Sequence, residues 1–232
     1  MPLDTETVLN EIAELHRKKP YLKAPVWQEL CAGSLSREQL KVLIKQNGII
    51  PLHNHNYHGR LYVVCPDPKW RARIAEVVYE EGTGRLFAGG KPHNELYLQL
   101  GEGVGVSREE MWATDYCAGA LAWKAHTSYL CGKSFLEGVS QHMLAGEAPV
   151  PTDGVSRYVA LRDIYKISDL ALEHFVVHQK ADKDHSSVGF DLLDQFAKTE
   201  EDRRLVIRTV SESLDMFLLM YRDIHRVVHQ VN

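Results

Sequence analysis

Residues 168–196 read SDLALEHFVVHQKADKDHSSVGFDLLDQF, and they place two histidines and an aspartate on one face of a predicted helix. Each residue of an α-helix turns the chain by ~100°, so His178, Asp182 and His185 lie within ~60° of one another. The helix also carries apolar side chains, at Leu170, Phe175, Val177 and Val188. We therefore expect an internal helix whose three polar side chains point into the protein, with a polar face on the surface as the alternative.

Helical patterning extends along almost the whole chain. Capping signals mark several helix starts, at Asp4, at Ser36 with Gln39, at Asp67 with Pro68, and at Ser107 with Glu110. Further helices are predicted over 135–146, over 168–196 and from Thr199 to about His229.

Interruptions in the pattern divide it into separate elements. Gly48 and Pro51 predict a kink in a long helix over 37–64, and segments 82–92 and 147–156 are predicted loops because they are rich in glycine or proline. No segment alternates apolar and polar residues between turns, as a strand would. The sequence predicts an all-α fold, one bundle of seven or eight helices that forms a single domain over residues 1–232.

The composition excludes several classes of protein. The chain has 232 residues, 44% hydrophobic and 25% charged, with a net charge of −4, which is typical of a globular protein and disfavours a nucleic-acid partner. No apolar stretch approaches the ~18 residues that a bilayer crossing needs, so we expect no membrane partner. The charged N-terminus and the four cysteines, which form no CxxC pair, predict a cytoplasmic protein.

The unusual feature is a set of twelve histidines, three of which sit on or near the helix described above. Two imidazoles and one carboxylate form an N/N/O ligand set that suits Fe(II) or Mn(II). A dinuclear site needs further ligands from other helices, and helix ends beside apolar residues supply candidates at Glu80, Glu81, His93 and Glu147. The ferritin-like class is disfavoured because no glutamate has a histidine three residues later.

The order of these residues resembles the haem-oxygenase-like di-iron oxidases and oxygenases, which share a superfamily with TenA, PqqC and CADD-like proteins. The most recognisable tract runs from Glu80-Glu81-Gly82 through PHNELYLQLGEGVGVSREEM at 92–111. Segments 33–40 and 65–68 also match, so the resemblance covers nearly the whole chain. It implies a haem-oxygenase-like helical bundle.

The resemblance also implies a set of six metal ligands, namely Glu80, His93, Glu147, His178, Asp182 and His185. Glu147 would be the bridging carboxylate by analogy. The loop between Glu80 and His93 is longer than usual in the family, so Glu81 is an alternative ligand, and Glu137 competes with Glu147.

By the same resemblance, the chain would bind two Fe(II) ions, with Mn as an alternative at one position, and use O2 as co-substrate. The implied substrate is a small amine, an amino-acid-like compound or a carboxylic acid in a biosynthetic pathway. The implied outcome is N-oxygenation, C–C cleavage or desaturation, and a homodimer is expected. Position 27 is Trp, where the branch that makes p-aminobenzoate from its own side chains has Tyr.

Other polar residues suggest a substrate pocket near the predicted kink. Lys45, His53, His55 and His58 are candidates for holding a substrate carboxylate, with a surface patch as the alternative for the histidines. His225 and His229 have helical spacing but lie near the end of the chain, where fraying disfavours a metal site.

Two other functions stay open at this point. One is a PqqC-like oxidase that needs no metal, although it requires positive groups where this chain has His178 and Asp182. The other is a non-catalytic helical bundle that binds a partner, which would leave the one-sided spacing of His178, Asp182 and His185 unexplained.

Overall fold

The computed structural model describes residues 4–147 and 150–231, and the side chains of residues 147–155 and 179–190 lie outside that description. Within the described residues the chain is helical, with no β-strand. The elements follow in the order α1 (Thr5–Lys18), η1 (Tyr21–Lys23), α2 (Pro25–Ala32), α3 (Arg37–Asn47), α4 (Asn54–Val64), α5 (Pro68–Thr83), α6 (His93–Val104), α7 (Arg108–Trp112), α8 (Ala118–Lys133), α9 (Phe135–Val139), η2 (Ser140–Glu147), α10 (Val150–Asp163), α11 (Glu173–Phe196) and α12 (Glu200–Val228).

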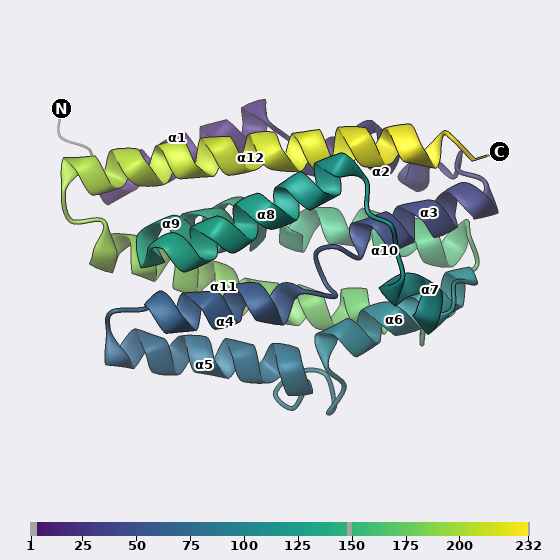
Figure 1. The fold of residues 1–232 in the computed structure, drawn as a ribbon, viewed down its shortest axis with the longest axis horizontal. Helices are drawn as coiled ribbons and strands as arrows, with labels where there is room; N and C mark the ends of the chain where they lie inside the picture. The colour runs from purple at the N-terminus through teal and green to yellow at the C-terminus, as the bar shows by residue number, and fades with distance from the viewer. Residues whose placement is uncertain (1–3, 148–149, 232) are drawn as a thin grey trace.

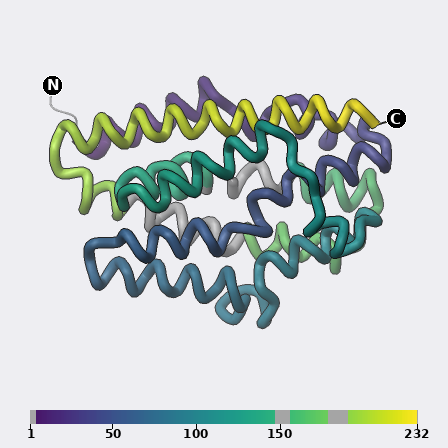
Figure 2. The backbone as a smooth tube through the Cα atoms, in the orientation of Figure 1, coloured from purple at the N-terminus to yellow at the C-terminus, as the bar shows by residue number. Residues whose placement is uncertain are grey.

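The longest helix, α12, forms one edge of the bundle, and the first helix packs beside it (Figure 1). Helix α8 packs along α12 on one side and against α4 on the other, and α4 in turn packs on α5. Helices α6 and α7 lie at one end, as the course of the backbone shows (Figure 2). Elements from both halves of the sequence therefore enclose the middle of the bundle.

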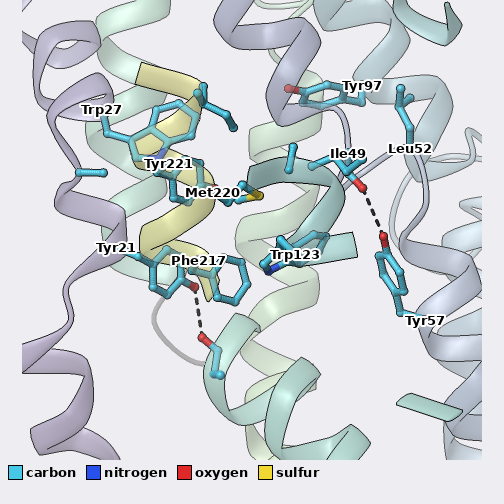
Figure 3. Packing of buried hydrophobic residues seen from close by; sticks show 14 of the residues in the cluster. Tyr21, Trp27, Ile49, Leu52, Tyr57, Tyr97, Trp123, Phe217, Met220 and Tyr221 are labelled. Atoms are coloured by element: carbon cyan, nitrogen blue, oxygen red, sulfur yellow. Dashed lines mark hydrogen bonds between the residues drawn. The ribbon is translucent and has the colours of Figure 1, made fainter. Parts of the chain in front are cut away.

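Aromatic side chains fill much of the core (Figure 3). The ring of Trp123 on α8 meets that of Tyr57 on α4 edge-on, with 5.6 Å between centroids. The ring of Tyr21 stacks on that of Phe217 of α12 at 4.2 Å, so the N-terminal segment is fixed to the C-terminal helix. Such ring pairs add about 0.5–1.5 kcal/mol each to the free energy gained from burial alone.

Several predicted elements are confirmed. The carboxylate of Asp4 caps α1, and the capping boxes at Ser36 and Ser107 are both present. Asp67 caps α5, with Pro68 as its first residue, and Thr199 caps α12. The all-α class is therefore as predicted.

The number of helices exceeds the predicted seven or eight, because breaks separate segments that the sequence pattern joins. The predicted kink in helix 37–64 is a full interruption between Asn47 and Asn54, which produces α3 and α4. The segment 135–147 divides into α9 and a π-helix, η2. A π-helix adds one residue per turn and leaves no mark in the hydrophobic pattern.

The loop predicted over 147–156 is wrong, because α10 begins at Val150. Pro151 therefore lies in the first helical turn, where proline is tolerated since that N–H has no partner within the helix. The helix predicted to begin at Ser168 begins instead at Glu173. None of the helices within the described residues combines the length and apolar character that a bilayer crossing requires.

Candidate metal centre

Two adjacent glutamates at the end of α5 are buried. Ile74 and Val77 of the same helix are buried in the core. Both Glu80 and Glu81 are almost completely shielded from solvent. The helix ends at Gly84, whose φ of 61° is in the left-handed region that favours glycine. Burying two neighbouring carboxylates is costly unless each has partners, so their contacts reveal what each one does.

Glu80 is fully engaged by the loop that follows it. One of its carboxylate oxygens accepts a hydrogen bond from the Leu86 backbone N–H at 2.6 Å, and the other accepts one from the Phe87 N–H at 3.1 Å. The second oxygen also lies 3.1 Å from Nε2 of His93. Glu80 thus fixes the loop 84–92 and orients the imidazole of His93.

Glu81 faces the other side of the same imidazole. Its Oε1 lies 3.1 Å from Nδ1 of His93 and accepts a hydrogen bond from Asn54 of α4 at 3.2 Å. The Nδ1 atom of His93 is buried and has no polar partner other than Glu81 among the described residues. A buried nitrogen that faces a carboxylate oxygen at this distance can share a cation with it, either a proton or a metal ion.

The charge balance of these three residues favours a cation. Burial opposes a charged imidazole, but Glu81 and Glu80 raise the pKa of His93 to about 9. Burial would likewise raise the pKa of Glu81, yet the charge and hydrogen bond of His93, with smaller contributions from His58 and His178, hold that pKa well below its usual range. Positive charge between the two carboxylates is therefore stabilised.

His178 completes a cluster with Glu81 and His93. Its ring centroid lies 4.8 Å from that of His93, and ligand atoms of all three residues lie within 4.8 Å of one another. The Nδ1–H of His178 donates a hydrogen bond to the backbone oxygen of His174 at 2.8 Å. This bond makes Nε2 the lone-pair nitrogen of His178, as is usual for metal-binding histidines.

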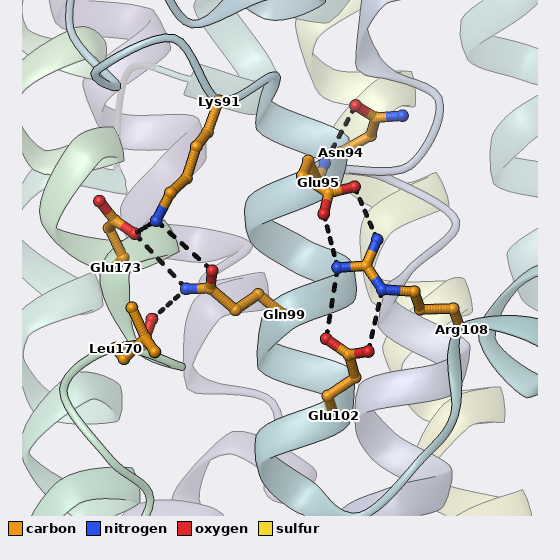
Figure 4. A network of polar contacts seen from close by, with 8 residues as sticks. All are labelled: Lys91, Asn94, Glu95, Gln99, Glu102, Arg108, Leu170 and Glu173. Atoms are coloured by element: carbon orange, nitrogen blue, oxygen red, sulfur yellow. Dashed lines mark hydrogen bonds and ion pairs between the residues drawn. The ribbon is translucent and has the colours of Figure 1, made fainter.

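A polar network holds the elements that carry these histidines together (Figure 4). Lys91, two residues before His93, pairs with Glu173 at the start of α11. Gln99 of α6 donates to the Leu170 carbonyl just before α11. On the other side of α6, Arg108 bridges Glu95 and Glu102 at 2.8–2.9 Å. The separation between His93 and His178 is thus set by contacts outside the cluster.

Three of the expected ligands lie outside the residues whose side chains are described: Glu147, Asp182 and His185. The backbone places Asp182 and His185 in α11 together with His178, and Glu147 at the last residue of η2. The competitor Glu137 is engaged elsewhere, by Lys133 and by the hydroxyl of Ser134, each at 2.7 Å.

The structure adds polar residues that sequence reasoning missed or underrated. His142 of η2 and His58 of α4 are buried and face each other, with 2.9 Å between their Nε2 atoms. His174 packs on His178 with 4.1 Å between centroids, and burial holds its pKa well below the usual range. Asn54 contacts Glu81 as described. The neighbours of His142 in sequence, Met143 and Leu144, are apolar, so nothing in the pattern pointed to it.

The structure places the four residues expected to line a substrate pocket at different sites. His58 is buried and faces His142, as described. His53 and His55 line a different, open depression together with Lys124, whose Nζ lies 3.3 Å from Nε2 of His53. Lys45 is on α3 and contributes to neither cavity.

A cavity of about 160 Å³ adjoins the cluster. His174 and His178 are part of its lining, and aromatic and aliphatic side chains supply most of the remainder. The donor set of Glu81, His93 and His178 is N/N/O, which suits Fe(II), and the buried Nδ1 of His93 lacks another partner among the described residues. The residues therefore fit an iron site.

Comparison with known proteins agrees with this chemistry. The sequence profile of a family described as iron-containing redox enzyme matches residues 42–218. The chain is 26% identical over 194 residues to a 4-aminobenzoate synthase of Chlamydia pneumoniae, covering 84% of each chain. It is 21% identical over 236 residues to a 4-aminobenzoate synthase of Nitrosomonas europaea, covering 95% of this chain and 92% of that one.

Solved structures share the fold. A Shewanella denitrificans domain described as having a haem oxygenase-like fold superposes with a TM-score of 0.79 at 15% identity, covering 100% of this chain and 95% of that one. A TenA homologue of Pseudomonas syringae gives 0.75 at 10% identity, covering 95% and 92%. A CADD-like protein of Nostoc punctiforme also gives 0.75, at 14% identity, covering 97% and 98%. The fold of this chain is therefore haem-oxygenase-like.

Proposed function

Because the chain belongs to the family of iron-containing redox enzymes, we propose that it is a non-haem di-iron oxidoreductase that uses O2. The observation that carries the proposal is the convergence of Glu81, His93 and His178 in the interior of the bundle. Their N/N/O donors suit Fe(II), and the two carboxylates at His93 stabilise positive charge there. An acidic cluster of this kind disfavours a metal-free, PqqC-like oxidase.

Glu81, His93 and His178 would hold one ion, with Glu80 orienting the imidazole of His93. Glu147, Asp182 and His185 are proposed to contribute to the second ion, with Mn as an alternative metal at one position. When bound, the metal pair would supply the electrons with which O2 is reduced.

The remaining work belongs to residues of the chain itself. The largely apolar lining of the cavity lowers the effective dielectric constant beside the site, which strengthens electrostatic interactions there. The hydrogen bond from His178 to the His174 carbonyl keeps the lone pair of His178 on Nε2. Asn54 holds the Glu81 carboxylate from the side of α4.

The substrate is proposed to be a small molecule in a biosynthetic pathway, either an amine, an amino-acid-like compound or a carboxylic acid. The relatives named 4-aminobenzoate synthase support a biosynthetic role. Trp27 occupies the position at which the branch that makes p-aminobenzoate from its own side chains has Tyr. We therefore do not propose that this chain makes a product from its own side chains. Homodimer formation, a single domain over residues 1–232 and a cytoplasmic location remain predictions.

The test is an anaerobic Fe(II) titration followed by admission of O2, with absorbance recorded throughout. The unsubstituted protein should bind two Fe(II) per chain and show a transient absorbance change with O2. His93→Ala and His178→Ala should each lose iron and the absorbance change. His126→Ala is the matched control, because His126 lies on α8 and contacts Ser213 of α12 instead.

Circular dichroism must show that all variants remain folded. Full iron content and O2 reactivity in both His93→Ala and His178→Ala would contradict the proposal.

A further inference from the structure

The cavity beside the candidate metal centre is small and largely apolar. Its volume of about 160 Å³ is close to that of a ~150 Å³ protein cavity that accommodates one benzene molecule. Trp27, Trp123, Phe217 and Tyr221 supply much of its lining. The space therefore fits a compound with one ring or a short chain.

One cation lies in this apolar lining. The guanidinium of Arg157, on α10, stacks over the ring of Trp27 with 4.6 Å between its carbon and the ring centroid. Its Nη2 is buried and has no hydrogen-bond partner among the described residues. Leaving a buried N–H of a charged group without an acceptor is expensive, so this position favours a ligand in the cavity that supplies one.

Another donor in the same lining shares this condition. The indole Nε1 of Trp123 is buried and makes no hydrogen bond within the described part of the chain. Indole and guanidinium nitrogens can only donate. By contrast, the cavity's phenols are satisfied: Asn47 donates to the Tyr97 hydroxyl and accepts from that of Tyr221, at 3.1 Å each. Among the described residues, the cavity lining thus offers a positive charge and donors that no hydrogen bond satisfies.

We propose that this cavity binds the carboxylate of a compact organic acid, and that Arg157 holds that carboxylate while stacked on Trp27. The inference rests on the proposed function, whose substrate class it narrows. An amine would be repelled by the guanidinium, whereas a carboxylate matches its paired N–H groups in charge and geometry. Because His174 and His178 line the same cavity, the bound acid lies next to the metal centre.

The experiment measures binding by the iron-free, full-length protein, so that no metal can hold the carboxylate. Calorimetric titrations compare benzoate, benzamide and benzylamine, which share one ring but differ in charge. A second pair, butyrate and butyramide, covers the short-chain case. We expect at least one acid to bind roughly 10- to 100-fold more tightly than its amide, and benzylamine not to bind.

Arg157→Gln should abolish the preference for the acid, and Arg157→Lys should retain part of it. Arg162→Gln is the matched control on the same helix, because Arg162 is exposed and paired with Asp163, and it should leave the preference unchanged. The comparison of acid with amide needs no variant, so it stands even if Arg157→Gln fails to fold.

Equal affinity for acid and amide in both pairs would overturn the inference, as would an acid preference that survives in folded Arg157→Gln. Failure here is distinguishable from failure of the proposed function. Iron and O2 reactivity with no acid preference would contradict only the carboxylate site, and acid preference without iron binding would contradict only the di-iron assignment.

Discussion

Glu80 and Glu81 are neighbours in sequence, yet their surroundings assign them different tasks. Glu80 accepts two backbone hydrogen bonds from the following loop, whereas Glu81 shares its oxygens between Asn54 and the cluster with His93 and His178. A carboxylate that already accepts from the backbone at both oxygens has little capacity left for a metal. The geometry therefore favours Glu81 as the ligand and Glu80 as the residue that orients His93.

This division of roles predicts different effects for Glu80→Gln and Glu81→Gln. In Glu80→Gln one oxygen becomes an NH2 facing a backbone N–H, which should lower the free energy of unfolding by about 1–3 kcal/mol. Glu81→Gln should weaken Fe(II) affinity by at least ~10-fold and change stability less. Urea unfolding and anaerobic Fe(II) titration measure the two effects. Loss of iron in Glu80→Gln with full retention in Glu81→Gln would reverse the assignment.

At the residue scale, the sequence identified most residues of the cluster. It could not determine which of the two adjacent glutamates belongs to it. The helical spacing identified His178, and the end of α5 identified both glutamates. Successive residues of a helix differ by ~100° in direction, so only the course of the loop 84–92 distinguishes Glu80 from Glu81. The pairing of His142 with His58 depends on η2, whose π-helical register follows from tertiary packing.

Among the elements, the loop 84–92 matters most for the site because it connects the glutamates of α5 to His93 of α6. Gly84 closes α5 with a φ of 61°, and a Cβ added there would lie 1.8 Å from the Lys91 carbonyl oxygen. Gly89 has a similar φ of 60°, but a Cβ added there would meet nothing within 4 Å. A comparison of substitutions at the two glycines therefore distinguishes the effect of backbone strain from the effect of steric contact.

Gly84→Ala should therefore be more harmful than Gly89→Ala. The latter should cost only the ~1–2 kcal/mol of a left-handed non-glycine residue. The former should cost clearly more and should weaken Fe(II) binding, because Lys91 must move and His93 follows two residues later. Thermal unfolding and Fe(II) titration of both variants provide the comparison. Equal losses in the two would show that the contact with Lys91 relaxes easily.

Element boundaries were predictable where a side chain caps a helix, as at Asp4, Ser36 and Ser107. The start of α10 was not predictable, because Pro151 follows no capping residue, whereas Pro68 follows Asp67. Pro151 indicated a loop in the sequence, but it lies in the first turn of α10, the helix that carries Arg157. For this reason the sequence directed attention to Lys45 and His53 as carboxylate-binding residues, and Arg157 went unnoticed.

For the whole molecule, three buried or half-buried histidines join different parts of the bundle as neutral groups. His16 of α1 donates to the Leu144 carbonyl of η2 at 2.9 Å, His126 links α8 to α12, and His53 accepts from Lys124. Burial lowers the pKa of all three, that of His53 to about 4. As the pH falls, the unfolded chain therefore takes up protons at these positions at a higher pH than the folded chain does.

The contribution of these three histidines to stability should consequently fall as the pH drops below about 6.5. The contribution of His53 is present above the pKa of the unfolded chain and is lost progressively down to about pH 4. Between about pH 7.5 and pH 5 we expect His53 alone to account for a loss on the order of 1–2 kcal/mol. Urea unfolding at several pH values checks this, and His53→Gln should show a smaller loss. An identical pH dependence in His53→Gln would contradict the prediction.

The pairing of α1 and η1 with α12 has a consequence for how the protein is made. Synthesis proceeds from the N-terminus, so Glu81, His93 and His178 leave the ribosome before Phe217 and Tyr221, which form a wall of the cavity. At roughly 5–20 residues per second, several seconds separate His178 from Tyr221. During that interval Tyr21 lacks the ring on which it stacks in the finished protein. The nascent chain thus presents Glu81, His93 and His178 to the surrounding solution before it can enclose them, and α12 closes the cavity last.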